Sequence, residues 1–277
     1  MVKTALVYDF DKTLCTKDMQ EYSLIPNLGY ENPADFWKEV TELKNENRMD
    51  SISAYLYLLQ KKYADNNEPL RKEMFVQAGK TIELFPGVDT WFDRVNAYGK
   101  SLGLDIEHYI ISSGMKEIIE NAAPASSFKH IYACSYLYDE NGYACWPSMI
   151  VNYTTKTQYI FRINKGFLDE EKDEELNKYT PRSKRAIPFT RMIYIADGLT
   201  DVPCMKLVRE YGGKSIAVYT PGSKTGKSTA EQLIEEQRAD FMSETDYRKN
   251  SDMENLVFRI LDHMKADAVL EGLEGFR

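Results

Sequence analysis

The chain has 277 residues, of which 43% are hydrophobic and 28% charged, and this ordinary globular composition excludes a disordered or collagen-like chain. With 35 basic and 43 acidic residues the formal net charge is −8, which argues against a general binder of nucleic acid or anionic membranes. The four cysteines, Cys15, Cys134, Cys145 and Cys204, contain no CxxC pair and do not form a disulfide framework.

The sequence contains no apolar run of the roughly 18 residues that a membrane span requires. The apolar start Ala5–Tyr8 ends at Asp9 and is too short for a secretory signal. We therefore expect a cytoplasmic protein whose partners are neither nucleic acid nor membrane. No particular oligomeric state is indicated.

The first predicted element is a buried strand, and a long helical stretch follows it. The strand is Thr4–Tyr8. From Cys15 to Glu83 no strand pattern occurs, and the sequence predicts helices over Ala34–Lys44, Ser51–Lys62 and Leu70–Lys80. This stretch has the character of an insert placed after the first strand.

The rest of the chain alternates between strand and helix patterns. Strands are predicted at Tyr109–Ile111, Met192–Ala196 and Ser215–Tyr219, and helices at Val88–Leu102, Met115–Ala122, Ser228–Arg238 and around Leu256–Met264. Between them, Asn141-Gly142 is a hairpin signal within the irregular stretch Phe128–Met149. This alternation predicts an α/β fold with a doubly wound, Rossmann-like parallel-sheet core.

Acidic pairs follow two of the predicted strands. Asp9 and Asp11 are spaced i, i+2, so in an extended chain both carboxylates point the same way. Asp197 and Asp201 follow the strand that ends at Ala196. Ligand sites in open α/β sheets lie at the carboxyl ends of strands. Such close acids repel one another unless a cation or a shared proton compensates, so the pattern indicates a site for one of these.

Two further features suit a phosphate. Ser112 and Ser113, followed by Gly114, end a strand at the start of a predicted helix, where hydroxyl and backbone N–H groups can cradle an anion. Lys156 supplies a balancing positive charge, with Lys165 as a competing candidate. The turn Pro221–Ser228 is similar to a P-loop but has Pro221 and the wrong glycine spacing, so we expect a solvated turn.

Together these motifs resemble the haloacid dehalogenase superfamily, specifically its phosphatases. Asp9–Thr13 is similar to the first motif, DxDx[TV], and Ser112 to the second. Lys156 matches the lone lysine of the third motif and Asp197–Asp201 the fourth, DGxxD. The resemblance implies a core of residues 1–14 and 84–277 and a helical type C1 cap of residues 15–83, as in phosphoserine-phosphatase-like members.

The resemblance also implies a mechanism. Asp9 attacks phosphorus and forms an aspartyl-phosphate, while Asp11 acts as general acid and then as general base. Mg²⁺ is the implied cofactor, held by Asp9, the backbone carbonyl of Asp11 and Asp197, with Asp201 orienting the metal ligands. Ser112 and Lys156 bind the phosphoryl oxygens, and Ser113, Gly114 and Asp18 contact the substrate.

The expected activity is Mg²⁺-dependent hydrolysis of a small phosphorylated metabolite, a phosphomonoester. Phosphoserine phosphatases carry a glutamate where this chain has Asp18 and a cap arginine that grips the substrate carboxylate. No basic residue occurs at the matching position, Tyr57–Leu59, and the cap is instead rich in aromatic residues such as Trp37 and Tyr55. Two alternatives remain: a phosphotransferase or phosphomutase that uses the same intermediate, and a non-catalytic binding protein with this fold.

Overall fold

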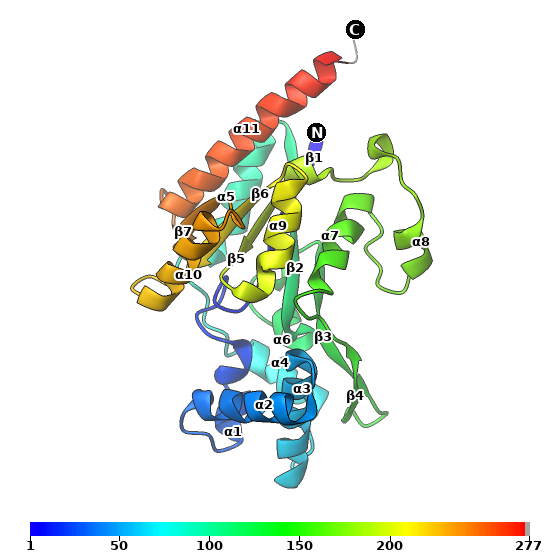
Figure 1. Cartoon of the computed structure of the whole chain (residues 1–277), viewed down its shortest axis with the longest axis vertical. Helices are drawn as coiled ribbons and strands as arrows, with labels where there is room; N and C mark the ends of the chain where they lie inside the picture. Colours follow the sequence, from blue (N-terminus) through cyan, green and yellow to red (C-terminus); the bar gives the residue numbers. More distant parts are fainter. Residues whose placement is uncertain (275–277) are drawn as a thin grey trace.

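The structure, a computed structural model, describes residues 1–274 and contains a seven-stranded sheet at its centre (Figure 1). The strand order is β4-β3-β2-β1-β5-β6-β7, and only β4 runs antiparallel to its neighbour. The strands are β1 (Val2–Tyr8), β2 (Leu104–Met115), β3 (His130–Tyr138), β4 (Ala144–Met149), β5 (Met192–Ala196), β6 (Lys214–Tyr219) and β7 (Phe241–Glu244). The predicted α/β fold with a mostly parallel sheet is confirmed.

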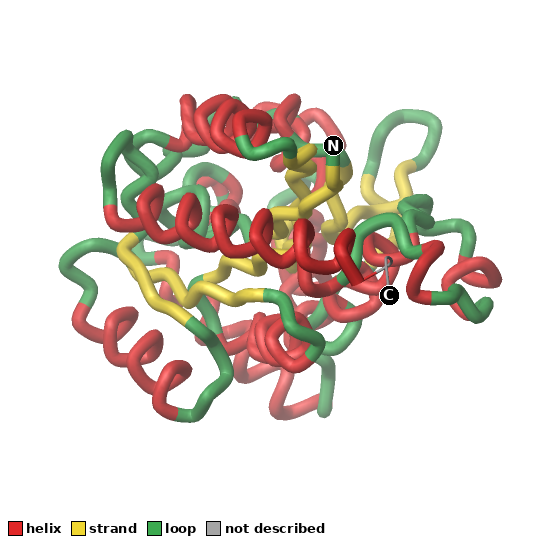
Figure 2. The backbone as a smooth tube through the Cα atoms, turned by 90° about the horizontal axis from the view of Figure 1, so that it is seen from above, coloured by secondary structure: helices red, strands yellow, loops and turns green. Residues whose placement is uncertain are grey.

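Strand β1 lies in the middle of the sheet. Residues Ala5–Tyr8 are fully buried, because β2 and β5 pair with its two edges and helices cover both faces of the sheet (Figures 1 and 2). Burial on both faces explains why the strand is a continuous apolar run in the sequence. Since the chain leaves β1 toward β2 and later returns to β5 on the other side, the carboxyl end of β1 is the switch point at which such sheets bind ligands.

The helices are α1 (Leu24–Asn27), α2 (Pro33–Asn47), α3 (Ser51–Asp65), α4 (Lys72–Gly79), α5 (Val88–Ser101), α6 (Lys116–Glu120), α7 (Lys156–Lys165), α8 (Asp173–Asn177), α9 (Val202–Glu210), α10 (Lys224–Glu235) and α11 (Asp252–Glu274). Helix α5 covers one face of the sheet, and α7 and α9 cover the other (Figure 1). Two of the insert helices have side-chain caps: Asn32 accepts a hydrogen bond from the Ala34 N–H, and Asp50 accepts from Ile52 and Ser53.

Helices α1–α4 form a lobe at the carboxyl end of the sheet, beside the β3–β4 hairpin (Figure 1). The two chain segments that enter and leave this lobe pair with each other. The Thr16 N–H donates to the Glu83 carbonyl at 3.0 Å, and the Phe85 N–H donates to the Leu14 carbonyl at 2.9 Å. These bonds lie at the boundaries predicted for the cap, and we keep the name cap for residues 15–83. The division itself stays a prediction.

Some elements differ from the sequence prediction. Helix α10 begins at Lys224 rather than Ser228, because the Ser223 hydroxyl caps it by accepting from the Gly226 N–H. Strand β7 was not predicted, since only Ser243 of its four residues is buried and the apolar run is absent. The stretch from Phe128 contains two strands joined by the expected hairpin, whose Gly142 has a φ of 80°.

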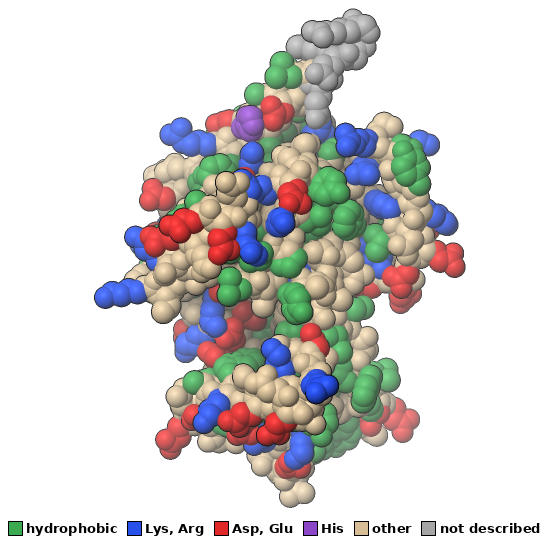
Figure 3. Space-filling model, viewed as in Figure 1, with side chains coloured by type: hydrophobic (Ala, Val, Ile, Leu, Met, Phe, Trp, Pro, Cys, Tyr) green, Lys and Arg blue, Asp and Glu red, His purple; other side chains and the backbone are tan. Residues whose placement is uncertain are grey.

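The surface carries charges of both signs. On the face shown in Figure 3, acidic and basic side chains are interspersed, so the net charge is not gathered into a single patch there. Over the described residues, no helix has the length and apolar character needed to cross a membrane. Two pairs of acids, Asp9 with Asp11 and Asp197 with Asp201, follow the carboxyl ends of β1 and β5.

Candidate active site

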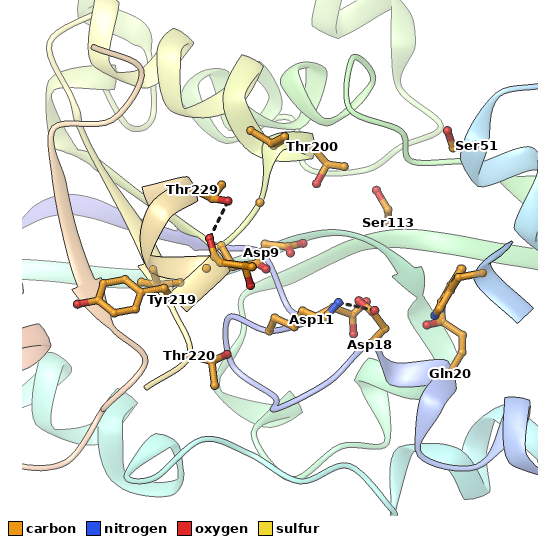
Figure 4. A pocket seen from close by; sticks show the side chains of 18 of the residues that line it. Asp9, Asp11, Asp18, Gln20, Ser51, Ser113, Thr200, Tyr219, Thr220 and Thr229 are labelled. Atoms are coloured by element: carbon orange, nitrogen blue, oxygen red, sulfur yellow. Dashed lines mark hydrogen bonds and ion pairs between the residues drawn. The ribbon is translucent and has the colours of Figure 1, made fainter. Parts of the chain in front are cut away.

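A pocket of about 850 Å³ opens at the carboxyl ends of β1 and β5, between the sheet and the cap helices. Figure 4 shows Asp9 at its centre, with residues of the cap side and of β6 and α10 on opposite sides. Of the predicted site residues, the pocket brings together Asp9, Asp11, Asp18, Ser113, Lys156 and Asp197. Its volume is within the range of small-molecule sites.

Lys156 is the centre of a buried ionic cluster. Its Nζ lies 2.9 Å from Asp9 Oδ1 and 2.7 Å from Asp201 Oδ1. All three side chains are buried. Burial alone would lower the pKa of Lys156, but Asp201 and Asp9 outweigh it and raise that pKa, so the ammonium group stays protonated. The cluster joins the end of β1, the start of α7 and the turn after β5.

Asp201 is held by three donors. Besides Lys156, the Tyr194 hydroxyl donates to Oδ1 at 2.5 Å and the Thr200 hydroxyl donates to Oδ2 at 2.9 Å. Tyr194 is fully buried in β5, three residues before Asp197. Because protein donors occupy both carboxylate oxygens, Asp201 is suited to orienting Lys156 and the neighbouring acids.

The acids fit a divalent cation. Asp9, Asp197 and Asp201 each offer a carboxylate oxygen, and these oxygens lie within 4.8 Å of one another. Burial, followed by the effect of neighbouring carboxylates, raises the pKa of Asp197, and burial together with Asp201 raises that of Asp9 against the opposing effect of Lys156. A cation among them would stabilise their ionised forms. An all-oxygen set of this kind suits Mg²⁺ rather than a thiophilic metal.

Asp11 lies on the cap side of Asp9. Its Oδ1 accepts a hydrogen bond from the Met19 N–H at 2.8 Å. Burial, followed by Asp18 and Asp9, raises the pKa of Asp11 well above its usual range. Next to it, Lys12 Nζ lies 2.5 Å from Asp18 Oδ2, and Lys12 has a φ of 53°, which turns the chain sharply after Asp11. The two predicted acids of the first motif therefore have different surroundings.

The two serines at the end of β2 differ in position. Ser112 is buried and its hydroxyl oxygen accepts from the Gly114 N–H at 3.0 Å, away from the pocket lining. Ser113 lines the pocket, and its buried hydroxyl has no partner among the described residues. Gly114 packs against Met19, whose Cε would lie 2.0 Å from an added Cβ. The role predicted for Ser112 stays a prediction.

Several lining residues were not predicted from the sequence. On the cap side Gln20 and Ser51 join Trp37 and Tyr55, and on the core side the pocket continues along Tyr219, Thr220 and Thr229 (Figure 4). The turn similar to a P-loop thus contributes Ser223, Thr225 and Gly226 to the wall, although it lacks the phosphate-binding spacing. Gln20 had a weak signal only, its position two residues after Asp18.

Two sequence comparisons give matches over most of the chain. Residues 6–206 match the family described as haloacid dehalogenase-like hydrolase. An uncharacterized protein of Borreliella burgdorferi is 27% identical over 283 residues, which cover 91% of this chain and 94% of that one.

Solved structures share the fold at low sequence identity. A phosphoserine phosphatase, solved as a phospho-aspartyl intermediate analogue, superposes with a TM-score of 0.56 at 15% identity, over 93% of this chain and 98% of that one. A hydrolase of the same family from Salmonella enterica also has a TM-score of 0.56 at 15% identity, over 86% of this chain but 66% of that one.

Proposed function

This chain belongs to the haloacid dehalogenase-like hydrolase family, and from that premise we propose that it is a Mg²⁺-dependent phosphatase of small phosphomonoesters. The observation that carries the proposal is the buried cluster in which Lys156 contacts Asp9 and Asp201, with Asp11 and Asp197 at the same pocket. The phosphoserine phosphatase of similar fold was solved as a phospho-aspartyl intermediate analogue, which supports the same intermediate here.

The reaction proceeds in two displacements. An Asp9 carboxylate oxygen attacks phosphorus, the bond from phosphorus to the leaving oxygen breaks, and Asp11 gives its proton to that oxygen. Water then attacks the phosphorus of the aspartyl-phosphate while Asp11 takes a proton from it. The bond between phosphorus and Asp9 breaks, inorganic phosphate leaves, and both carboxyl groups return to their starting forms.

Mg²⁺, held by the Asp9 carboxylate, the Asp11 backbone carbonyl and Asp197, would supply positive charge for the phosphoryl oxygens. Asp201, whose oxygens already accept from Tyr194 and Thr200, keeps Lys156 and the metal-binding acids in place. Lys156 and Ser112 bind the transferring phosphoryl group, for which the Ser112 hydroxyl must turn from the Gly114 N–H toward the pocket, and Ser113, Gly114 and Asp18 contact the substrate.

The test is phosphate release from p-nitrophenyl phosphate with Mg²⁺, for the native protein and for Asp9→Asn. We expect activity that EDTA abolishes and Mg²⁺ restores, and an Asp9→Asn variant at least about 10³-fold slower because the amide is not a nucleophile. The control is Asp89→Asn, an exposed acid at the start of α5.

Three other outcomes would contradict the proposal. A labile phosphorylated protein without phosphate release would indicate a phosphotransferase or mutase. An Asp9→Asn variant with full activity would exclude Asp9 as the nucleophile. An inactive native protein that still binds phosphate analogues would indicate a binding protein.

A further inference from the structure

We propose that the leaving group of the substrate carries hydrogen-bond donors but no carboxylate, and that the Gln20 amide and the Ser113 hydroxyl receive it. The inference rests on the proposed function and specifies its substrate class: phosphate esters of small polyols or amino alcohols. It concerns the cap side of the pocket, whose lining includes Asp11, Asp18, Gln20 and Ser113 (Figure 4).

Gln20 and Ser113 both present buried polar atoms with no partner. Gln20 is 2% exposed, and its Oε1 has no hydrogen-bond partner among the described residues. The Ser113 hydroxyl oxygen is also buried and has no hydrogen-bond partner among the described residues. A buried acceptor left unpaired costs about 1–3 kcal/mol, so such atoms are normally satisfied by a ligand or water. Both residues line the pocket, so the two oxygens lie within its wall.

The orientation of the Gln20 amide follows from Tyr55. The Tyr55 hydroxyl donates its proton to the Ser113 carbonyl at 3.0 Å. Burial raises the pKa of Tyr55, and the neighbouring Gln20 side chain works against that shift. Since Tyr55 has already donated its proton to Ser113, a Gln20 amide group that faces Tyr55 is the nitrogen rather than the oxygen. The amide oxygen is therefore left to accept from the substrate.

Gln20 and Ser113, which together we call the leaving-group subsite, are connected rigidly to the proposed general acid, Asp11. Gln20 follows Met19, whose N–H donates to Asp11. Glu21, the next residue, accepts from Trp37 Nε1 at 2.8 Å, and the Trp37 ring packs edge-on against Tyr55 with centroids 5.9 Å apart. A leaving group protonated by Asp11 would thus lie directly against Gln20 and this aromatic wall.

The charges of the pocket exclude a carboxylate at this position. Among the described residues, the only cations that line the pocket are Lys12 and Lys156. Lys12 is paired with Asp18, and Lys156 with Asp9 and Asp201. A substrate carboxylate on the cap side would be desolvated next to Asp11 and Asp18 with no free cation to balance it, whereas hydroxyl or ammonium groups would be stabilised there.

The experiment compares substrates that differ by one carboxylate. With the native protein and Mg²⁺, kcat/KM is measured for phosphoethanolamine against phosphoserine, and for glycerol phosphate against phosphoglycerate. In at least one pair we expect kcat/KM for the ester without the carboxylate to be higher by roughly tenfold or more. A preference for phosphoethanolamine would indicate an amino alcohol as the leaving group, and a preference for glycerol phosphate would indicate a polyol. p-Nitrophenyl phosphate is the reference substrate.

The outcomes separate the inference from the proposed function. If kcat/KM in both pairs is equal, or is higher for the ester with the carboxylate, the inference is wrong. It is also wrong if the protein cleaves p-nitrophenyl phosphate but none of the four esters. No cleavage of any ester would overturn the proposed function itself.

A substitution tests the residue assignment. Gln20→Lys places a cation in the subsite and should raise the phosphoserine to phosphoethanolamine ratio of kcat/KM by about tenfold. The matched control Gln77→Lys alters an exposed glutamine of α4 in the same cap and should leave the ratio unchanged. An unchanged ratio in a folded Gln20→Lys variant would show that Gln20 does not contact the leaving group. If that variant fails to fold, the comparison of the native protein still decides the substrate class.

Discussion

Lys156 joins the two acidic motifs at the level of single residues. Its ammonium group contacts one carboxylate after β1 and one after β5. Without it, Asp9 and Asp201 would lie buried near each other with their mutual repulsion uncompensated, which typically costs several kcal/mol. The same ammonium group lies next to the proposed nucleophile and can stabilise the charge on a transferring phosphoryl group. The structural role of Lys156 and its proposed catalytic role therefore coincide in one side chain.

The third-motif lysine can be tested with a matched pair of substitutions. Lys165 was the competing candidate, but its Nζ binds backbone carbonyls, including that of Lys178 at 2.7 Å. We expect Lys156→Met to lower kcat by about 10²–10³-fold, because a preorganised positive charge next to Asp9 is lost. Lys165→Met should leave kcat unchanged. Both are assayed below their melting temperatures, and loss of activity in Lys165→Met alone would transfer the role to Lys165.

Within β2, His108 takes part in a buried chain of hydrogen bonds. Trp91 Nε1 donates to the Tyr8 hydroxyl, which lies 3.1 Å from His108 Nδ1, and His108 Nε2 lies 3.0 Å from Asn96 Oδ1. Since the amide oxygen of Asn96 only accepts, Nε2 carries the proton and Nδ1 accepts from Tyr8. The chain ties β1 and β2 to α5 and requires a neutral imidazole.

This network makes stability depend on pH. Burial lowers the pKa of His108 to about 3, so between that value and its ordinary pKa of about 6.5 the unfolded state binds a proton that the folded state does not. The free energy of unfolding should therefore fall as pH decreases through this window, by up to about 1.4 kcal/mol per pH unit from this residue. His108→Gln should make that slope shallower in urea denaturation, whereas His263→Gln, at an exposed position of α11, should not. An identical slope in His108→Gln would contradict the assignment.

The elements show what the sequence can and cannot predict. Strands β1 and β5 were predictable because parallel strands buried on both faces are continuous apolar runs, and acids that follow them, Asp9, Asp11 and Asp197, line one pocket. Strand β7 was not predictable, because it is largely exposed and therefore has no continuous apolar run. Gln20 was missed for a different reason: its proposed role depends on an unpaired, buried amide oxygen in the wall of a pocket that distant segments share, and its place two residues after Asp18 does not reveal that.

In the whole molecule, the position of the cap relative to the sheet decides whether the pocket forms. Besides the paired connections at Leu14–Thr16 and Glu83–Phe85, cap helix α4 packs on α6, which follows β2. Gly79 lies at this contact. A Cβ added there would lie 2.6 Å from the Ile118 carbonyl oxygen and 2.7 Å from Asn121 Cβ. Because the Ile118 oxygen is a backbone atom, it cannot rotate away.

We therefore expect Gly79→Ala to displace α4 from α6 and with it the cap wall of the pocket. Overpacking of this kind costs about 1–3 kcal/mol, which should appear as a lower midpoint in urea denaturation. Because Gln20, Trp37 and Tyr55 move with the cap, KM should rise more than kcat falls. Gln77→Ala, at an exposed position of the same helix, separates this effect from a change in helix propensity. Native KM in a destabilised Gly79→Ala variant would show that the α4–α6 contact supports folding without positioning the pocket.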